Sequence, residues 1–410
     1  MGLIAAVILR PWDFVPVLAS LKPVTLSILA IAGWMVVSGR PVRFLSLPLS
    51  KFLVGVWAFM LLGILNPYQT APVLDFGVKY VQFLVLFGLI GTLMCYETLI
   101  IRLSTVLSAV GLALAALTVI AYRSGDFSVD GRIEGIGEGM LSDPNDLASM
   151  LVTLLPAAYL AFTLNRSVLV RGLAAAAMAG LLAGLVLTQS RGGLIALAAV
   201  LAFYLAISRV SMFRKVATVA AVIAAGIAMA PDAVMQRYAS IANAAQTDES
   251  AMSRLAVWKA GAQMTMDHPL WGVGVNNFEI VYGTRYIDRV GAGDVWRSAH
   301  NSVVEVAGEL GLIGLLCWLG WMVGALWLLF RERRMWLRRD PDANDPRTRR
   351  MTACAECWMA AQIAFLSAAM FLSKAFDIAT VILCGTSVAV AIMMRRRYDR
   401  TSISPNPAAL

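Results

Sequence analysis

Apolar stretches of about 20 residues, long enough to cross a bilayer, recur from one end of this chain to the other. Only 14% of its 410 residues are charged, whereas a soluble domain has about 25%. Lipid cannot hydrogen-bond to the backbone, so each stretch must satisfy its own N–H and C=O groups as a helix. The sequence therefore predicts an all-α, polytopic bundle of transmembrane helices.

The hydropathy pattern predicts eleven spans, and residues 2–20 are a candidate for a twelfth. The eleven lie near residues 24–38, 50–66, 74–94, 103–122, 146–164, 172–188, 193–208, 215–230, 302–330, 353–373 and 378–394. The chain is thus divided into an N-terminal bundle (1–230), a long loop (231–301), C-terminal transmembrane helices (302–394) and a tail (395–410).

Basic residues are concentrated in alternate connections, which the positive-inside rule assigns to the cytoplasm. These connections contain Arg40, Arg43 and Lys51; Arg102; Arg166 and Arg171; Arg209, Arg214 and Lys215; the cluster from Arg331 to Arg350; and Arg395, Arg396, Arg397 and Arg400. The opposite face receives 66–74, 123–145, 189–192, 231–301 and 374–377. The membrane topology thus explains the net charge of +9. The basic residues form no continuous face in the sequence pattern, so we expect no nucleic-acid partner.

The loop 231–301 is far longer than the other connections on its face, and loops of more than about 15 residues are usually functional or disordered. Its aromatic residues indicate that it folds against the membrane. Within it, Leu255, Trp258, Ala262 and Met266 recur at helical spacing. This predicts an interfacial helix over 253–266 with these side chains on one face, toward the bundle or lipid.

Arg191 follows Ser190 in a short turn on the non-cytoplasmic face and precedes two glycines. An arginine near membrane depth is costly and normally faces a polar cavity, so a functional role is one interpretation. The other is an arginine that extends to the membrane interface. Arg254, on the loop helix, is by itself typical of a solvated helix face.

His300 lies just before the span at 302, and histidine can take a proton from a hydroxyl near neutral pH. Asn301 and Ser302 are alternative N-cap candidates for that span, and Glu305, about one turn further along, is a candidate to orient the imidazole. An ordinary interfacial histidine is the alternative. His268 precedes a proline at a helix end, where a capping role explains it.

Two other groups of polar residues have structural explanations. Asp143 to Asp146 open the span at 146, where a capping turn accounts for them; a divalent-ion site is the alternative. Cys354 and Cys357 form a C-x-x-C pair, but a zinc site needs about four ligands, so packing is the expected role. We therefore predict neither a metal site nor a cofactor.

The order of these features resembles the O-antigen ligase and O-antigen polymerase family of bacterial membrane glycosyltransferases. The motifs that carry the resemblance lie mostly within 145–315. They are Ser190-Arg191-Gly192-Gly193; Ser253-Arg254-Leu255 with Trp258; His268-Pro269-Leu270-Trp271-Gly272-Val273-Gly274; His300-Asn301-Ser302 with Glu305; Glu309-Leu310-Gly311; and Asp143-Pro144-Asn145.

The resemblance implies a GT-C-like, multi-pass protein of the bacterial inner membrane whose site faces the periplasm. It implies transfer of a glycan from an undecaprenyl-pyrophosphate carrier to an acceptor hydroxyl, for which the lipid A core is our first choice. Arg191 and Arg254 would bind the pyrophosphate and His300 would be the base. Ser190, Asn301 and Glu305 would support them.

Arginine side chains can stabilise the pyrophosphate leaving group without a metal, and a base on the acceptor side indicates inversion. Three alternatives stay open from the sequence: a polymerase of O-antigen or exopolysaccharide, a protein O-oligosaccharyltransferase, and, from another class, a transporter or flippase of lipid-linked sugars. Transporters often contain inverted repeats, and no repeat is visible in this sequence.

Overall fold

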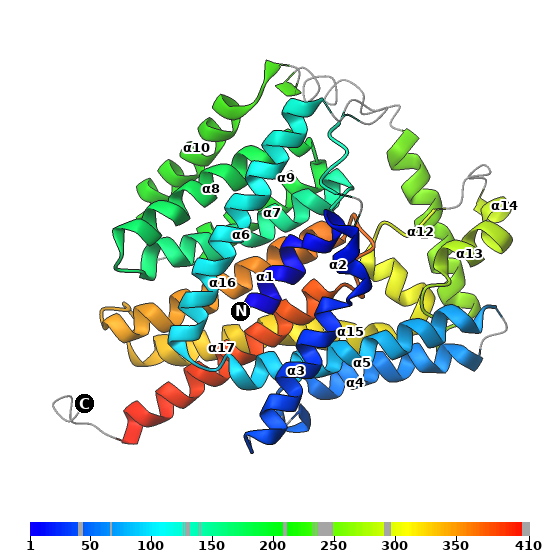
Figure 1. Cartoon of the computed structure of the whole chain (residues 1–410), viewed down its shortest axis with the longest axis horizontal. Coiled ribbons are helices and arrows are strands. Elements are labelled where there is room, and N and C mark those ends of the chain that lie inside the picture. Colours follow the sequence, from blue (N-terminus) through cyan, green and yellow to red (C-terminus); the bar gives the residue numbers. More distant parts are fainter. Residues whose placement is uncertain are drawn as a thin grey trace.

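The computed structural model describes residues 1–39, 44–65, 68–125, 127, 132–137, 139, 141–207, 211–232, 234–235, 249–290 and 297–403. The predicted cytoplasmic arginines Arg40, Arg43 and Arg209 lie outside these ranges. Within the ranges the chain is helical, and one isolated bridge between Phe127 and Ile133 is the only β pairing. Figure 1 shows α15, α16 and α17 crossing the middle of the bundle, with α6 to α10 on one side and α4 and α5 on the other.

The elements follow one another in this order: α1 (Gly2–Leu9), η1 (Pro11–Asp13), α2 (Pro16–Ser20), α3 (Pro23–Val37), η2 (Phe44–Ser46), α4 (Ser50–Leu62), η3 (Gly63–Leu65), α5 (Thr70–Leu93), α6 (Glu97–Ser124), α7 (Pro144–Leu164), α8 (Val168–Thr188), α9 (Arg191–Ile207), α10 (Met212–Met229), α12 (Glu249–Asp267), α13 (Phe278–Val281), η4 (Tyr282–Tyr286), α14 (Ile287–Val290), α15 (Ser302–Arg339), α16 (Pro346–Ala369) and α17 (Ile378–Ile403).

Among the described residues, seven helices are long and apolar enough to cross a membrane: α5, α6, α7, α8, α10, α15 and α17. The shorter apolar helices are α3, α4 continued by η3, and α9. Each of the eleven predicted spans coincides with a helix, so the prediction of an all-α membrane protein is confirmed, whereas the count of twelve spans is not.

Residues 2–20, the candidate twelfth span, do not form one helix. Helix α1 ends at Leu9, and Arg10 adopts a left-handed conformation with φ 51°. Pro11 and Pro16 then begin η1 and α2. Proline has no N–H to donate to the preceding turn and therefore starts new helices here instead of continuing the first.

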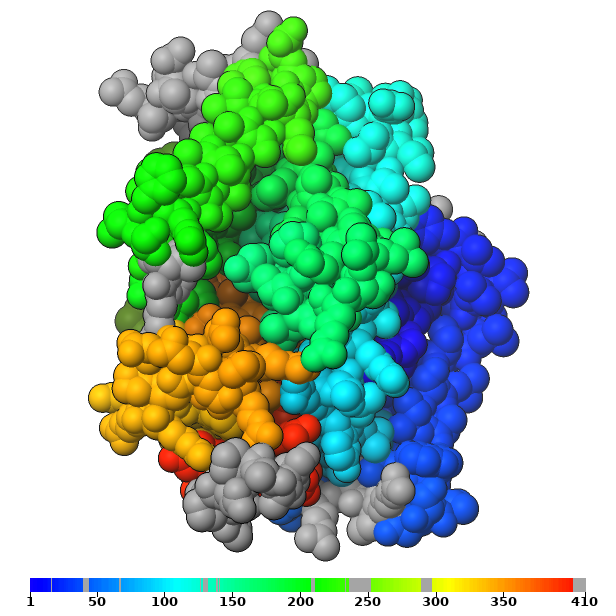
Figure 2. All heavy atoms as spheres, turned by 90° about the vertical axis from the view of Figure 1, so that its left-hand side faces the viewer, coloured from blue at the N-terminus to red at the C-terminus, as the bar shows by residue number. Residues whose placement is uncertain are grey.

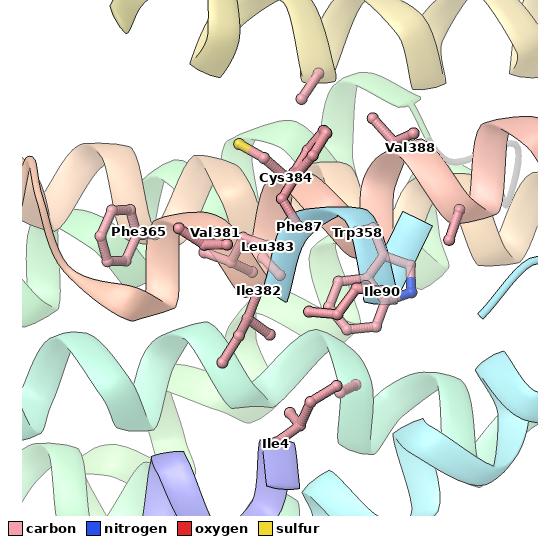
Figure 3. Close-up of a cluster of buried hydrophobic side chains, with 14 of the residues drawn as sticks. Ile4, Phe87, Ile90, Trp358, Phe365, Val381, Ile382, Leu383, Cys384 and Val388 are labelled. Atoms are coloured by element: carbon pink, nitrogen blue, oxygen red, sulfur yellow. The ribbon is translucent and has the colours of Figure 1, made fainter. Parts of the chain in front are cut away.

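The core of the bundle is formed by α5, α16 and α17, with α1 packed against it. Figure 3 shows Phe87 and Ile90 of α5 beside Trp358 of α16 and the segment Val381–Val388 of α17. A Cβ atom on Gly385 would lie 3.2 Å from Ile90, so α17 approaches α5 closely. Between helices in lipid, close packing of this kind is a main source of stability.

Contacts between the connections define two ends of the bundle. At the first, the Arg350 end, Glu97 pairs with Arg350 (2.7 Å) and Arg397 (3.7 Å), and Arg333 donates to the Ile207 carbonyl (3.1 Å). Figure 2 looks onto this end, where the connections around residues 100, 168, 212 and 340 appear in cyan, green and orange. These are connections that the charge pattern predicts on one side of the membrane.

The second end, the His300 end, contains the connections predicted on the opposite side, together with α12, α13 and α14 (Figure 1). Helix α12 packs on α15 there. The buried side chains of α12 include Val257, Ala260 and Met264. On the predicted apolar face, Leu255 is 47% and Met266 is 70% exposed, so of the two predicted surroundings, bundle or lipid, this face has the one outside the bundle.

Helix α15 is interrupted at Gly311, whose φ of 70° and ψ of −175° are not helical. The segment after His268 supplies the hydrogen bonds that the break removes. Val273 and Gly274 donate to the carbonyls of Gly308 (2.8 Å) and Glu309 (3.0 Å), and Leu312 donates to the Pro269 carbonyl (2.8 Å). Irregular backbone at membrane depth is tolerated where protein buries it in this way.

Candidate active site at the His300 end

His300 has a left-handed backbone conformation, with φ 45°, immediately before α15. Its N–H donates to the Ser373 hydroxyl (3.0 Å), and its Nε2 atom lies 3.4 Å from the Ser298 hydroxyl. A non-glycine residue in this conformation costs about 1–3 kcal/mol, so the surrounding contacts must hold it there. Strain of this kind is concentrated at functional sites.

The residues after His300 supply those contacts. The Asn301 side chain accepts hydrogen bonds from the N–H groups of Val303 (2.9 Å) and Val304 (3.2 Å), which confirms it as the N-cap of α15. The Ser302 hydroxyl donates to the Leu372 carbonyl (2.8 Å) and accepts from the Lys374 N–H (2.9 Å). The start of α15 is thus fixed to the turn 372–374 between α16 and α17.

Helix α12 positions Arg254 relative to His300. The indole N–H of Trp258 donates to the Ala299 carbonyl (3.1 Å), one residue before His300. Arg254 precedes Trp258 by four residues, and residues at this spacing share one face of a helix. Arg297 donates to the Ser253 hydroxyl (3.1 Å) and adds a second connection. The structure therefore brings Arg254 to the same side of α12 as His300.

The surroundings of His300 lower its pKa from the ordinary value of 6.5. Burial is the largest cause, and the positive charges of Arg254 and Arg297 act in the same direction. The negative charges of Asp143 and Glu279 oppose them. The imidazole is therefore neutral near pH 7, which is the form that can accept a proton.

Arg191 is the first residue of α9, and its side chain is exposed at the His300 end. The turn before it is well fixed: the Ser190 hydroxyl accepts from the Gly193 N–H (3.2 Å) and donates to the Asn145 amide oxygen (2.8 Å). A Cβ atom on Gly192 would lie 3.5 Å from Phe371. The turn that holds His300 therefore also packs against the Arg191 turn.

Two cations that the sequence reasoning did not single out complete these connections. Arg132 donates to the same Asn145 oxygen (2.9 Å) that binds Ser190. Lys374, whose side chain is 9% exposed, pairs with Asp146 (3.1 Å) and Asp377 (3.4 Å). Lys374 could have been found by the argument used for Arg191, because it is a cation in a connection predicted on the non-cytoplasmic face.

Other predicted polar residues have contacts of their own. Asp143 caps α7, as predicted, by accepting from Asn145 and Asp146. His268 Nε2 lies 3.0 Å from the Tyr68 hydroxyl. Glu305 accepts from the Ala375 N–H (3.4 Å), and the side-chain contact of the imidazole is with Ser298. Orientation of His300 by Glu305 thus stays a prediction.

Within the described ranges, no three histidine, cysteine, aspartate or glutamate side chains lie close enough together to hold a metal ion. Cys354 and Cys357 are buried in α16 as free thiols.

Residues 173–319 match the family model described as O-antigen ligase. This segment of the chain is similar to the O-antigen ligase family. The match extends from α8 into α15 and includes Arg191, Arg254 and His300. The O-antigen ligase family is associated with enzymes that transfer glycans, and with lipid-linked glycan substrates in general. A search of curated protein sequences found no match to the chain.

Proposed function

We propose that this protein is a glycosyltransferase of the O-antigen ligase type, which moves a glycan from undecaprenyl pyrophosphate to an acceptor hydroxyl. The observation that carries the proposal is the arrangement around the turn 371–374. This turn holds His300 through Ser373 and packs against the Arg191 turn, while Trp258 holds Arg254 on the His300 side of α12. The O-antigen ligase match, which includes Arg191, Arg254 and His300, supports it.

In the proposed reaction, His300 removes the proton from the acceptor hydroxyl as the oxygen attacks the anomeric carbon of the donor. The bond from that carbon to the pyrophosphate oxygen breaks, and undecaprenyl pyrophosphate leaves. Arg191 and Arg254 neutralise the charge that develops on it, so the mechanism needs no metal. A single displacement inverts the anomeric centre.

The protein is proposed to lie in the bacterial inner membrane with the His300 end in the periplasm. The distribution of lysine and arginine supports this orientation, because the Arg350 end carries the basic connections. The lipid A core is the first candidate for the acceptor. The long loop is proposed to act as a cover that contributes Arg254 to the site.

The central experiment is glycan transfer in vitro by the purified protein with a lipid-linked donor. We expect His300→Ala to abolish transfer while the protein is still inserted in the membrane at normal levels. Undiminished transfer by this variant would rule out the assigned base. Transfer without any membrane gradient separates an enzyme from a transporter of lipid-linked sugars.

A second variant tests the arginine role. We expect Arg191→Lys to lower the rate by about tenfold or more, since a lysine ammonium cannot form the paired hydrogen bonds of a guanidinium with phosphate. Arg171→Lys, on an exposed residue in the first turn of α8, is the matched control and should have wild-type activity. Full activity of Arg191→Lys would contradict pyrophosphate binding by Arg191.

A further inference from the structure

A cavity of about 460 Å³ lies at the His300 end, and residues of the turn 373–377 form part of its wall. Glu305 and Glu309 of α15, Lys374 and Arg10 contribute polar atoms to its wall. Phe76 and Phe376, whose ring centroids are 6.0 Å apart, contribute apolar surface. Small-molecule sites have this size, roughly 300–1,000 Å³, and this mixture of aromatic walls and a few polar groups.

Glu309, one of the residues of the wall, has an unfilled hydrogen-bonding capacity. Glu309 is 3% exposed, and its Oε1 atom accepts from the Phe278 N–H (3.1 Å). Its Oε2 atom is buried and forms no hydrogen bond with any residue in the described part of the chain. A buried carboxylate oxygen without a donor is costly, so this atom favours a ligand that brings one.

The cations of the cavity do not satisfy this need. Lys374 is paired with Asp146 and Asp377, and Arg10 is paired with Asp13. Glu305, one turn before Glu309, forms no ion pair within 4 Å among the described residues. Two carboxylates one turn apart therefore face a ligand that must donate hydrogen bonds, and the phenylalanine rings favour one with an apolar face.

We propose that this cavity binds a sugar ring of the acceptor, with its hydroxyl groups donating to Glu309 and Glu305 and its C–H face packed on the phenylalanine rings. Sugars combine these two properties. The identification of the sugar as part of the acceptor rests on the proposed function.

The position of the cavity fits this assignment. Glu305 follows His300 by five residues, which corresponds to roughly 7–8 Å along a helix. Ser373, which binds the His300 N–H, also lines the cavity. A sugar bound there would place the next unit of the same acceptor beside the imidazole.

The test is a direct binding measurement on the full-length protein in nanodiscs, prepared without sugar-based detergents. Methyl β-D-glucopyranoside is titrated while saturation-transfer NMR records its contact with the protein. We expect saturable binding, weakened about tenfold or more in Glu309→Gln, whose amide keeps an acceptor for Phe278 but can place a donor where Oε2 lies. Val24→Phe, which adds volume to the cavity wall, should weaken binding similarly.

Folding of each variant is checked by elution as a single species, and Glu305→Gln replaces Val24→Phe if the latter fails this check. His300→Ala should bind the sugar as the wild type does, so this result is independent of whether His300 catalyses transfer. The proposal is overturned if binding does not saturate or if the cavity variants bind the sugar as tightly as the wild type. It is also overturned if a cation, tetramethylammonium, or a largely apolar alcohol, cyclohexylmethanol, binds more tightly than the sugar.

Discussion

Replacement of Lys374 by methionine should destabilise the protein more than any other removal of a single surface-loop cation. The Lys374 ammonium lies 3.1 Å from Asp146 and 3.4 Å from Asp377, and the three side chains are only 9%, 19% and 6% exposed. Removal of one partner from a buried ion pair typically costs about 3–5 kcal/mol, because the remaining charge is left without compensation. Here two carboxylates lose the same lysine partner.

We therefore expect Lys374→Met to lower the free energy of unfolding by about 3 kcal/mol, which is more than a hundredfold in the folding equilibrium. Unfolding is measured by titration with SDS in mixed micelles. Arg395→Met is the matched control: the Arg395–Asp399 pair is 57% and 53% exposed, and such pairs contribute about 0–1 kcal/mol.

A triple variant tests the cause of the loss. Lys374→Met combined with Asp146→Asn and Asp377→Asn removes all three charges and should recover most of the lost stability. The amide oxygen introduced by Asp377→Asn would still be an acceptor for the Ala379 N–H, which Asp377 binds at 2.8 Å. The reasoning is refuted if Lys374→Met costs no more than Arg395→Met, or if neutralising both aspartates gives no recovery.

Two further predictions concern His300 and the break in α15. The chain has only two histidines, so NMR of histidine-labelled protein can follow the pKa of His300 directly, with the signal assigned by comparison with His268→Gln. Arg254→Met removes a positive charge near the imidazole and should raise the pKa of His300. The acidic limb of the pH–rate profile should then move to higher pH. Asp143→Asn keeps the cap of α7 but removes a negative charge, so it should lower the pKa of His300 and move the acidic limb to lower pH. Shifts of the same sign in the two variants would contradict the electrostatic argument. Gly272→Ala should destabilise the protein by several kcal/mol, because φ at Gly272 is 65° and a Cβ atom would overlap the Glu309 backbone. Gly125 also has a positive φ, 78°, but the nearest atom to its Cβ position is 4.0 Å away, so Gly125→Ala should cost only about 1–2 kcal/mol. Equal losses of stability in SDS titration would show that the contact with α15 is not the cause.

Hydropathy predicted the helices well because backbone groups in a bilayer must be hydrogen-bonded within the protein. All eleven expected spans are helices, since an apolar segment in lipid must pair its own backbone groups. Residues 2–20 are the exception. They are apolar enough to suggest a span, but Pro11 and Pro16 interrupt the helix.

Packing of α12 could not be predicted from periodicity. Spacing predicted that Leu255, Trp258, Ala262 and Met266 share a face toward the bundle or lipid, and it did not single out Val257, Ala260 and Met264, which are the buried side chains. A Cβ atom on Gly261 would overlap Val304 of α15, so the buried face of α12 requires a close approach to that helix. That requirement comes from a tertiary contact that spacing within the helix does not encode.

Most of the candidate site residues were named from the sequence, but the residues that connect them were not. His300, Arg191 and Arg254 were singled out because cations and a histidine near membrane depth are costly. Ser373 lies in a short connection with no motif around it, yet it holds the His300 backbone. A serine gives no signal in the sequence when its role depends on a partner 73 residues away.

These connections restrict how the long loop can move over the site. Trp258 is bonded to Ala299. Beyond α12, Val273 and Gly274 are bonded to the broken turn of α15. A motion that carried α12 and the segment after it away would have to break these three hydrogen bonds and the one between Arg297 and Ser253, at about 0.5–1.5 kcal/mol each. Rearrangement of the Arg254 side chain breaks none of them. Opening for a lipid-linked donor is therefore expected to begin with Arg254, while Trp258 keeps His300 in position.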